Sequence, residues 1–297
     1  MSITRRSIYP HGLIVLAFVF AIVSSAPAQT PSSSPTPTPR QSSKPSLEHE
    51  FFKNIIRDQK AIWTSPFHLH SRDARWAAPL GLGTAALIAT DQKTGDEIAE
   101  SNRTLNVSRI VSYAGSAYGV GAIAATFYLV GRAGHNDRAR ETGILGAEAL
   151  IDSAIVVTAV KEITQRTRPS GGKSRSDFFD GGSSFPSGHS IEAWSLAAIV
   201  ASEYHDRPLV QISAYGVASA VSVARFTGRK HYLSDVLVGS AMGYGIGKYV
   251  YHAHHRKSSV SAGDEPEESR SSSRWPMIAP EYDRHARQYG VALAWSF

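Results

Sequence analysis

The chain has 297 residues, of which 42% are hydrophobic, so it is long enough to bury a large core, and a wholly disordered protein is excluded. The net charge of +6 falls to +4 without Arg5 and Arg6, which lie in a segment that we expect to be removed; this is too mild to indicate nucleic-acid binding, and no basic stripe interleaved with aromatic residues accompanies it. The absence of cysteine excludes disulfides, thiolate catalysis and metal sites built on sulfur.

Residues 1–28 have the pattern of a secretory signal peptide. Arg5 and Arg6 supply the positive start, residues 12–25 the apolar segment, and Ala-Pro-Ala at 26–28 the small-residue cleavage pattern. The apolar segment is shorter than the ~20 residues that a spanning helix needs, which favours cleavage over an uncleaved membrane anchor. We therefore expect an exported chain, and export without cysteine suits a Gram-negative periplasm.

Two polar segments bound the part of the chain that is expected to fold into helices. Residues 29–47 form a Ser/Thr/Pro-rich linker, and residues 257–275 form a polar linker. Between them, residues 48–256 contain apolar runs that rarely alternate as strands do, which predicts a single all-helical domain. Six runs have the length of helices: 75–90, 110–130, 144–164, 187–204, 209–225 and 232–251.

The C-terminal segment, residues 276–297, departs from this helical pattern and is expected to be strand-like. In its last nine residues, YGVALAWSF, larger and smaller side chains alternate with the period of two that is typical of a strand. One strand is too few to close a barrel, which needs about eight. We expect a strand that packs back on the helical domain or pairs with a neighbouring segment.

The first group of chemically active residues is KEITQRTRP at 161–169. Lys161 and Arg168 are seven residues apart, so on a helix they would lie two turns apart on one face, and Pro169 would end that helix. Two cations near a helix end suit an anion. A solvated basic helix end that interacts with the helix dipole has the same pattern and is the alternative.

The second group is SSFPSGHS at 183–190, directly before an apolar run. Ser187 and Gly188 would stand at the start of a helix, where free backbone N–H groups and a partial positive charge favour phosphate. His189 would then be within reach as a proton donor. Ordinary helix capping is the alternative interpretation. Ser183 and Ser184 are expected to be loop residues without a special role.

The third group is ARFTGRKHYLSD at 224–235. His231 and Asp235 are spaced i, i+4, so we expect them on one helix face, where the carboxylate would accept from one ring nitrogen and leave the other nucleophilic. Arg225 would offer a planar guanidinium to an oxyanion. Alone, such a pair is more often a local contact, but the three groups together supply the cations, amides, nucleophile and acid that phosphoryl transfer needs.

In order and spacing, the three groups resemble the signature of the type 2 phosphatidic acid phosphatase and vanadium haloperoxidase superfamily. The resemblance rests on Lys161 with Arg168-Pro169, on Pro186-Ser187-Gly188-His189, and on Arg225 with His231 and Asp235. It covers residues 144–251 and implies a six-helix bundle of that family's type. Ala224 departs from the pattern, in which a serine precedes the arginine of the third group.

The resemblance implies a role for each matching residue. His231 would attack phosphorus, Asp235 would orient it, and His189 would protonate the leaving alkoxide and then activate water. The residues that would hold the transferring phosphoryl group are Lys161, Arg168, Ser187, Gly188 and Arg225. The implied hydrolysis runs through a phosphohistidine and uses no metal and no cofactor, with vanadate as a mimic of the phosphate.

The implied function is an exported, metal-independent phosphatase that acts on a phosphomonoester or a lipid (pyro)phosphate. The alternatives are a vanadium-dependent haloperoxidase and a non-catalytic protein that binds phosphate or lipid. The expected partner is a phosphorylated small molecule or lipid, with contact to a membrane surface and no nucleic acid; the sequence does not indicate an oligomeric state.

We expect a periplasmic domain that is soluble or peripherally attached, because the acidic residues Glu148, Asp152 and Glu192 interrupt apolar runs and are costly inside a membrane. An inner-membrane protein with six spans is the alternative.

Two further groups have structural interpretations. YHAHHRK at 251–257 carries His252, His254 and His255, and without neighbouring carboxylates these are expected to form a solvated cationic helix end rather than a metal site. Glu148 and Asp152 lie one turn apart in an apolar run and are expected to make structural hydrogen bonds or to face solvent, rather than to act as an acid/base pair.

Overall fold

The computed structural model describes residues 47–68, 70–97, 102–169, 176–255, 277–283 and 288–294. The predicted signal peptide at 1–28 and the predicted linkers, apart from Leu47, lie outside these ranges. The chain divides into two units between His255 and Arg256, a helical unit and a strand unit, and each is described by itself.

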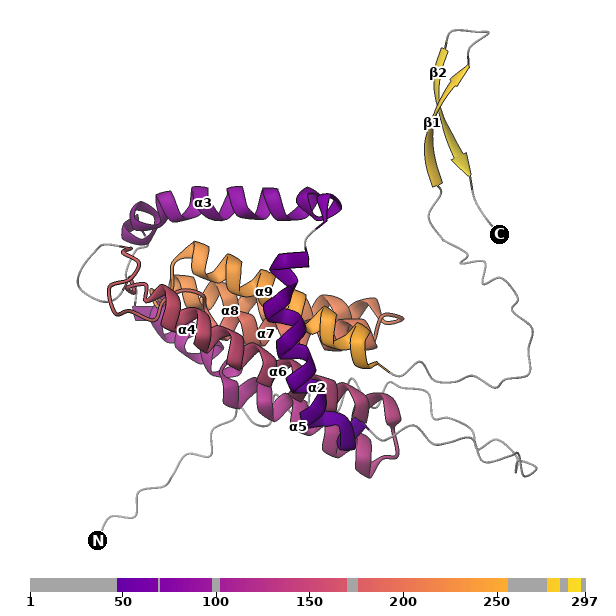
Figure 1. The fold of residues 1–297 in the computed structure, drawn as a ribbon, viewed down its shortest axis with the longest axis horizontal. Helices are drawn as coiled ribbons and strands as arrows, with labels where there is room; N and C mark the ends of the chain where they lie inside the picture. The colour runs from indigo at the N-terminus through magenta and orange to yellow at the C-terminus, as the bar shows by residue number, and fades with distance from the viewer. Residues whose placement is uncertain are drawn as a thin grey trace. The chain divides into compact units, whose positions relative to one another are not determined.

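The described helical unit contains eight α-helices and two short 3-10 helices (Figure 1). In chain order they are α2 (Leu47–Thr64), η1 (Ser65–His68), η2 (Ser71–Asp73), α3 (Ala74–Glu97), α4 (Asn102–Ala114), α5 (Ala117–Ala133), α6 (Asp137–Thr164), α7 (Gly188–Glu203), α8 (Pro208–Thr227) and α9 (Leu233–His254). The prediction of an all-helical bundle is confirmed for this unit, with two helices more than the six expected runs.

The extra helices have local causes. The run expected at 110–130 is broken into α4 and α5, because Ser116 caps α5 by accepting a hydrogen bond from the Gly119 amide at 3.2 Å. At Gly115 the chain approaches α8 so closely that a Cβ there would lie 2.1 Å from Val221. Helix α2 was not among the six predicted runs because charged residues separate its buried positions, such as Leu47 and Ile55.

Helix α7 is the central helix of the unit, packed against α6, α8 and α9. One side of α7, including Leu196 and Val200, belongs to a core shared with α5 and α8. The other side, including Ile191 and Ile199, belongs to a core shared with α6 and α9. Burying each such side chain stabilises the fold by about 1.5–3 kcal/mol. The start of α7 is therefore held firmly at one end of the bundle.

Glycines on α9 let its backbone touch that of α7. A Cβ at Gly243 would lie 2.1 Å from the Ile191 carbonyl oxygen, and a Cβ at Gly239 would lie 2.7 Å from the Ser187 carbonyl oxygen. Because the two helices meet this closely, the Ser187 amide donates a hydrogen bond to the carbonyl of Asp235 at 3.0 Å. The contact thus joins the start of α7 to the start of α9.

We expect Gly243→Ala to destabilise the protein by about 1–3 kcal/mol, because the new methyl group overlaps the Ile191 carbonyl and the helices must move apart. Gly245→Ala is the matched control, since a Cβ at Gly245 meets nothing within 4 Å and alanine stabilises a helix interior by about 0.5–1 kcal/mol. Thermal unfolding of the two purified variants measures the difference. Equal midpoints would contradict the close packing of α7 on α9.

The C-terminal end of α9 corrects the interpretation of its histidines. His254 lies with its Nε2 atom 2.8 Å from Asp58 of α2, and His255 lies with its Nδ1 atom 3.0 Å from Glu141 of α6. The expectation that these residues lack carboxylates is therefore wrong, because the carboxylates come from helices that are distant in sequence. Only His252 of the three is exposed.

Glu148 and Asp152 make the structural hydrogen bonds that the sequence suggested. Glu148 accepts from the Asn54 amide at 3.1 Å, and Asp152 accepts from the Gln59 amide at 2.8 Å. Both carboxylates are fully buried, so neither of them faces solvent. The partners both belong to α2, which is thereby fixed to α6.

The strand unit is a two-stranded antiparallel sheet of β1 (Met277–Asp283) and β2 (Gln288–Ala294). The register pairs Met277 with Ala294 and Asp283 with Gln288. The strand expected from the alternation in YGVALAWSF is found as β2, while residues 295–297 lie outside the described part. Strand β1 also lies in the predicted strand-like segment 276–297, although MIAPEYD itself does not alternate and contains a proline.

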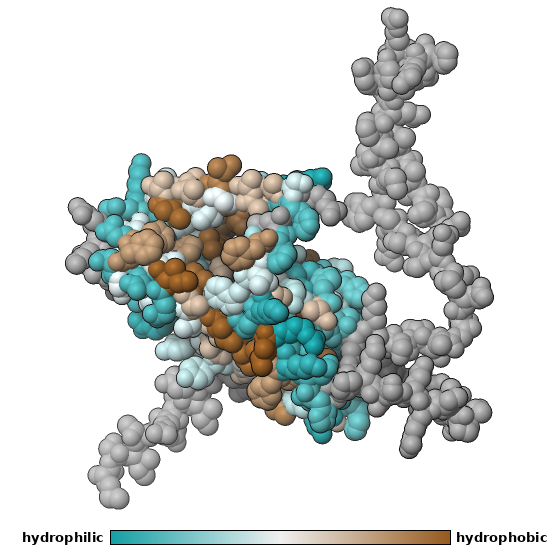
Figure 2. Space-filling model, in the orientation of Figure 1, coloured by the Kyte–Doolittle hydropathy of each residue, from teal (hydrophilic) through white to brown (hydrophobic). Residues whose placement is uncertain are grey.

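Two described helices, α6 and α8, are long and apolar enough to cross a membrane, and a third candidate arises if α4 and α5, bent by 41°, count as one span. The helices that the structure describes thus do not supply the six spans of the alternative prediction. Large apolar side chains are also exposed, among them Phe67 at 86% and Leu209 at 79%. Figure 2 shows such brown areas on the face in view.

Candidate active site

The second motif begins α7, as the sequence predicted. Ser187 is the N-cap residue and Gly188 the first helical residue. The Ser187 hydroxyl makes no capping bond; it is fully buried and accepts from the Ser190 hydroxyl at 3.0 Å. The ammonium group of Lys161 lies 3.6 Å from where a Cβ on Gly188 would be. A cation thus lies beside the first turn of α7, where free N–H groups favour an anion.

The first motif is split between a helix and a loop, so the expectation that Lys161 and Arg168 share a helix face is wrong. Helix α6 ends at Thr164, and Gln165 turns the chain in a left-handed conformation with φ of 44°. The turn is fixed because Asp180 and Gly182 of the returning loop donate backbone hydrogen bonds to the Gln165 carbonyl. Arg168 therefore lies in the loop after α6.

The side chain of Arg168 is tied to the loop before α7. Its Nη2 atom donates to the Ser183 hydroxyl at 3.2 Å. The neighbouring Ser184 accepts a hydrogen bond from His231 at its carbonyl and donates one from its hydroxyl to Asp235. The expectation that Ser183 and Ser184 have no special role is therefore wrong.

The third motif places its histidine before α9 rather than on it. Tyr232 is the N-cap residue, so His231 belongs to the preceding loop and Asp235 to the first turn of the helix. The Nδ1 atom of His231 donates to the Ser184 carbonyl at 2.7 Å and lies 3.7 Å from the Asp235 carboxylate. The hydrogen bond expected to Asp235 is thus replaced by one to Ser184, with Asp235 at ion-pair distance.

This arrangement fixes the tautomer of His231. Because Nδ1 carries the proton that is donated to the Ser184 carbonyl, Nε2 keeps its lone pair. Burial lowers the pKa of His231 despite the neighbouring Asp235 charge, which keeps the ring neutral. Asp235 lies close enough to stabilise a positive charge on the ring.

Asp235 is held by a network that the sequence did not reveal. Its carboxylate accepts from Arg166 Nη1 at 2.6 Å, from the Ser184 hydroxyl at 2.5 Å and from the Tyr232 amide at 2.9 Å. Burial alone would raise the pKa of Asp235, but its contacts with His231, Arg166 and Ser184 hold it below the usual value. Asp235 therefore stays ionised beside His231.

Arg166 is the centre of this network and is fully buried. Its Nη2 atom donates to Asp91 of α3 at 2.8 Å, and its guanidinium lies over the rings of Phe178 and Tyr232 at 4.7 and 4.5 Å from their centroids. Asp91 also accepts from the amide of Ser234 at 3.2 Å. Helix α3 is thereby linked to the loop of the first motif and to the start of α9.

A polar cavity of about 340 Å³ opens beside His189 and Arg225. Ala224 lines it, so the serine that the family pattern has at this position would place a hydroxyl there; Ser108 and Ser112 of α4 supply hydroxyls to the same cavity. The Nε atoms of Arg168 and Arg225 are buried and have no hydrogen-bond partner within the described residues. Such donors are costly without a partner, and an oxyanion would satisfy them.

The electrostatics of His189 show that the predicted residues converge. Burial lowers its pKa to about 3, aided by the positive charges of Arg225, Lys161 and Arg168. His189 is therefore neutral at pH 7 when no anion is bound. A phosphate dianion among the same cations would offset their charge and raise the pKa of His189.

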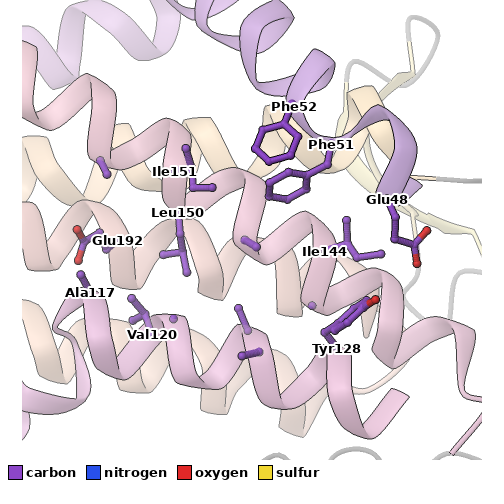
Figure 3. A pocket seen from close by; sticks show the side chains of 16 residues that line it. Glu48, Phe51, Phe52, Ala117, Val120, Tyr128, Ile144, Leu150, Ile151 and Glu192 are labelled. Atoms are coloured by element: carbon purple, nitrogen blue, oxygen red, sulfur yellow. The ribbon is translucent and has the colours of Figure 1, made fainter. Parts of the chain in front are cut away.

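An apolar groove of about 540 Å³ runs along α6 between α2 and α5 (Figure 3). Figure 3 shows Glu192 at one end and Glu48 at the other, with Leu150, Ile151 and Phe51 between them. Glu192 lies one helical turn after His189 on α7, and its charge reaches Lys161. The groove thus ends close to the cationic cluster.

Comparisons with known proteins agree with this arrangement. Residues 143–259 match the sequence model of the PAP2 superfamily. The chain is 30% identical over 122 residues to a lipid A 1-phosphatase of Porphyromonas gingivalis; the match covers 40% of this chain and spans about a quarter, 26%, of that relative.

Two solved structures align with part of this chain. One is a transmembrane PAP2-type phosphatidylglycerolphosphate phosphatase of Bacillus subtilis, with 20% identity, a TM-score of 0.46, and coverage of 59% of this chain and 94% of that one. The other is LpxE of Aquifex aeolicus, with 18% identity, a TM-score of 0.43, and coverage of 52% and 88%. The matched residues 143–259 include all three motifs, from Lys161 to Asp235.

Proposed function

We propose that the protein is an exported lipid phosphatase that hydrolyses a phosphomonoester or pyrophosphate of a lipid without a metal ion. The proposal rests on the convergence of His189, Lys161, Arg168 and Arg225 beside the buried His231 at the start of α7. The apolar groove that ends one turn from His189 favours a substrate with acyl chains over a small organic phosphate.

In the first half-reaction, Nε2 of His231 attacks phosphorus while the bond from phosphorus to the lipid oxygen breaks. His189 gives its proton to the leaving oxygen, and the phosphoryl group stays on His231. Lys161, Arg168 and Arg225 stabilise the charge on the equatorial oxygens. The Gly188 amide and the Ser187 hydroxyl complete the proposed phosphate site; Ser187 is buried in the free protein, so its hydroxyl is the part of the site that must open.

In the second half-reaction, His189 takes a proton from water, the water oxygen attacks phosphorus, and the bond to His231 breaks. The step releases inorganic phosphate, frees the imidazole of His231 and leaves His189 protonated, as it was before the first half-reaction. The low pKa of His189 in the free protein suits this cycle. Bound phosphate raises this pKa, so that His189 carries the proton that the first step needs. Once that proton has left with the lipid oxygen, His189 is the neutral base that the second step needs.

We place the site at the outer face of the cytoplasmic membrane or in the periplasm. Residues 1–28 have the pattern of a signal peptide, the apolar helices α6 and α8 have the length of spans, and large apolar side chains are exposed. A protein held at the membrane would meet lipid phosphates directly. Since α6 and α8 have the length of spans, we expect the protein to resist extraction by alkaline carbonate. Release of the protein by carbonate would instead support the soluble or peripherally attached domain that the sequence suggested.

The test of the proposal compares lipid and water-soluble substrates in a variant with a filled groove. Gly121 lines the groove and a Cβ there meets nothing within 4 Å, so Gly121→Leu narrows the groove without disturbing its backbone. We expect kcat/KM for long-chain phosphatidate to fall about tenfold or more, as two CH₂ groups lose their burial. Release of phosphate from glycerol 3-phosphate should stay unchanged.

Gly216→Leu of α8 is the matched control, because its Cβ also meets nothing within 4 Å and it lies outside the groove. If Gly121→Leu lost the same activity on both substrates, or if both variants lost the same activity on phosphatidate, the groove would not be part of the substrate site. Peroxide-dependent halide oxidation by the vanadate-loaded protein, without phosphatase activity, would favour the haloperoxidase alternative. Binding of phosphatidate without phosphate release would favour a non-catalytic protein.

A further inference from the structure

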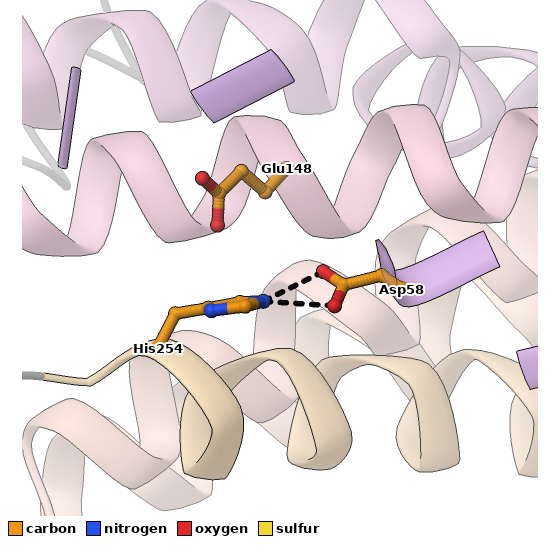
Figure 4. A group of neighbouring side chains, drawn as sticks. All are labelled: Asp58, Glu148 and His254. Atoms are coloured by element: carbon orange, nitrogen blue, oxygen red, sulfur yellow. Dashed lines mark hydrogen bonds and ion pairs between the residues drawn. The ribbon is translucent and has the colours of Figure 1, made fainter. Parts of the chain in front are cut away.

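Three helices bring a second group of chemically active side chains together, far from the catalytic histidines. Asp58 of α2, Glu148 of α6 and His254 of α9 place one ligand atom each within 4.8 Å of one another. Figure 4 shows the carboxylates on either side of the imidazole. Along α6, Glu148 lies roughly 20 Å from Lys161, at 1.5 Å per residue. The cluster is thus separate from the phosphate site.

The cluster is sealed from solvent. The side chains of Asp58 and Glu148 are fully buried, and that of His254 is 6% exposed. The Nε2 atom of His254 lies 2.8 and 2.9 Å from the two oxygens of Asp58, so the imidazole faces the carboxylate symmetrically (Figure 4). Two buried carboxylates thus lie beside a single imidazole, whose Nε2 atom donates to Asp58.

An unpartnered oxygen points into this cluster. The Oε1 atom of Glu148 accepts from Asn54, whereas Oε2 makes no hydrogen bond with any residue that the structure describes. Figure 4 shows the Glu148 carboxylate directed towards the pair formed by His254 and Asp58. Asp152, one turn further along α6, also has a buried carboxylate oxygen, Oδ2, that makes no hydrogen bond with any described residue. Buried carboxylate oxygens without a donor are costly, and a cation would satisfy them.

We propose that Asp58, Glu148 and His254 bind one divalent cation of the first transition row, of the zinc or manganese type. One imidazole nitrogen with carboxylate oxygens is a donor set that such ions accept, whereas magnesium and calcium prefer oxygen alone. At bond lengths of about 2.0–2.2 Å, ligand atoms a few ångströms apart close around the ion with small side-chain movements. The ion replaces the proton on His254 Nε2, which leaves as binding occurs.

A neighbouring cluster does not share these properties. Glu141, Glu203 and His255 also come within reach of one another, but His255 is partly exposed and Arg138 already lies 3.9 Å from Glu203 as a counter-charge. A second cation there would meet a positive guanidinium. The site is therefore the buried one, and it holds a single ion.

The ion has a structural role. Asp58 belongs to α2, outside the matched residues 143–259, while Glu148 and His254 belong to α6 and α9 inside them. One metal ion would thus fasten α2, the first helix that the structure describes, to two helices that carry the proposed active site. Since it lies far from the histidines of the site, its removal changes stability first and catalysis only through unfolding.

The experiment measures zinc binding and thermal unfolding of the full chain after treatment with EDTA. We expect one Zn²⁺ per chain by calorimetry and metal analysis, and a rise in Tm of about 5–10 °C when zinc exceeds Kd by about a hundredfold. Glu148→Gln keeps the shape and the Asn54 contact, so it should unfold near the wild-type Tm in EDTA and lose the zinc-dependent rise. Asp58→Asn should lose it as well.

His252→Gln is the matched control, because His252 is exposed on the same helix end, two residues from His254. It should bind zinc and respond as the wild type does. Loss of zinc binding in this variant would mean that the exposed histidines bind the ion instead of the buried site, and it would overturn the proposal. So would the absence of a Tm rise in the wild type, or a rise that Glu148→Gln and Asp58→Asn retain.

Discussion

Replacing His231 by alanine is expected to abolish phosphatase activity, with kcat reduced by about 10⁴-fold or more. The reason is that Nε2 is the proposed nucleophile, left without a proton because Nδ1 donates to the Ser184 carbonyl, and alanine has no nitrogen that could replace it. The measurement is release of inorganic phosphate from phosphatidate by purified protein. Tight binding of vanadate should persist, because Lys161, Arg168 and Arg225 remain in place.

His231 is buried, so a second variant separates chemistry from folding. His231→Asn keeps an N–H group that can donate to Ser184 but has no ring nitrogen to attack phosphorus, and it should be as inactive as the alanine variant. His252→Ala removes an exposed histidine of the same chain and should keep full activity. Activity of His231→Asn near the wild-type level would rule out the phosphohistidine.

The sequence was most informative where a motif is local. Gly188 and His189 begin α7 as predicted, because a short stretch of backbone decides where a helix starts. The sequence was less informative about how residues several positions apart lie relative to one another. Arg168 is in a loop because Gln165 turns the chain, and the turn depends on backbone bonds from Asp180 and Gly182, whose positions no local pattern encodes.

Contacts between distant segments were beyond the reach of the sequence. Arg166 stands inside the first motif, yet its partner Asp91 lies 75 residues earlier, in a helix whose pattern only indicates amphipathic packing. In the same way, Asp58 and His254 are 196 residues apart, so the sequence predicted solvated histidines at the end of α9. A single sequence contains the residue types of both networks but not their proximity.

Replacing Arg166 by methionine is expected to destabilise the protein by about 3–5 kcal/mol, the cost of leaving buried charges unpaired. Asp91 and Asp235 would both lose their guanidinium partner in a site that water does not reach. For a helical unit of this size, the loss corresponds to a Tm lower by about 10 °C or more. Thermal unfolding of the purified variant in EDTA measures it without interference from metal binding.

The matched control is Arg132→Met, because Arg132 is exposed in the last turn of α5; its Tm should stay within about 2 °C of the wild type. Arg166→Met combined with Asp91→Asn should regain part of the lost stability, since one of the two unpaired charges is then gone. A variant Arg166→Met as stable as Arg132→Met would mean that Asp235 does not depend on this ion pair. It would then be Ser184 and the Tyr232 amide alone that hold Asp235 beside His231.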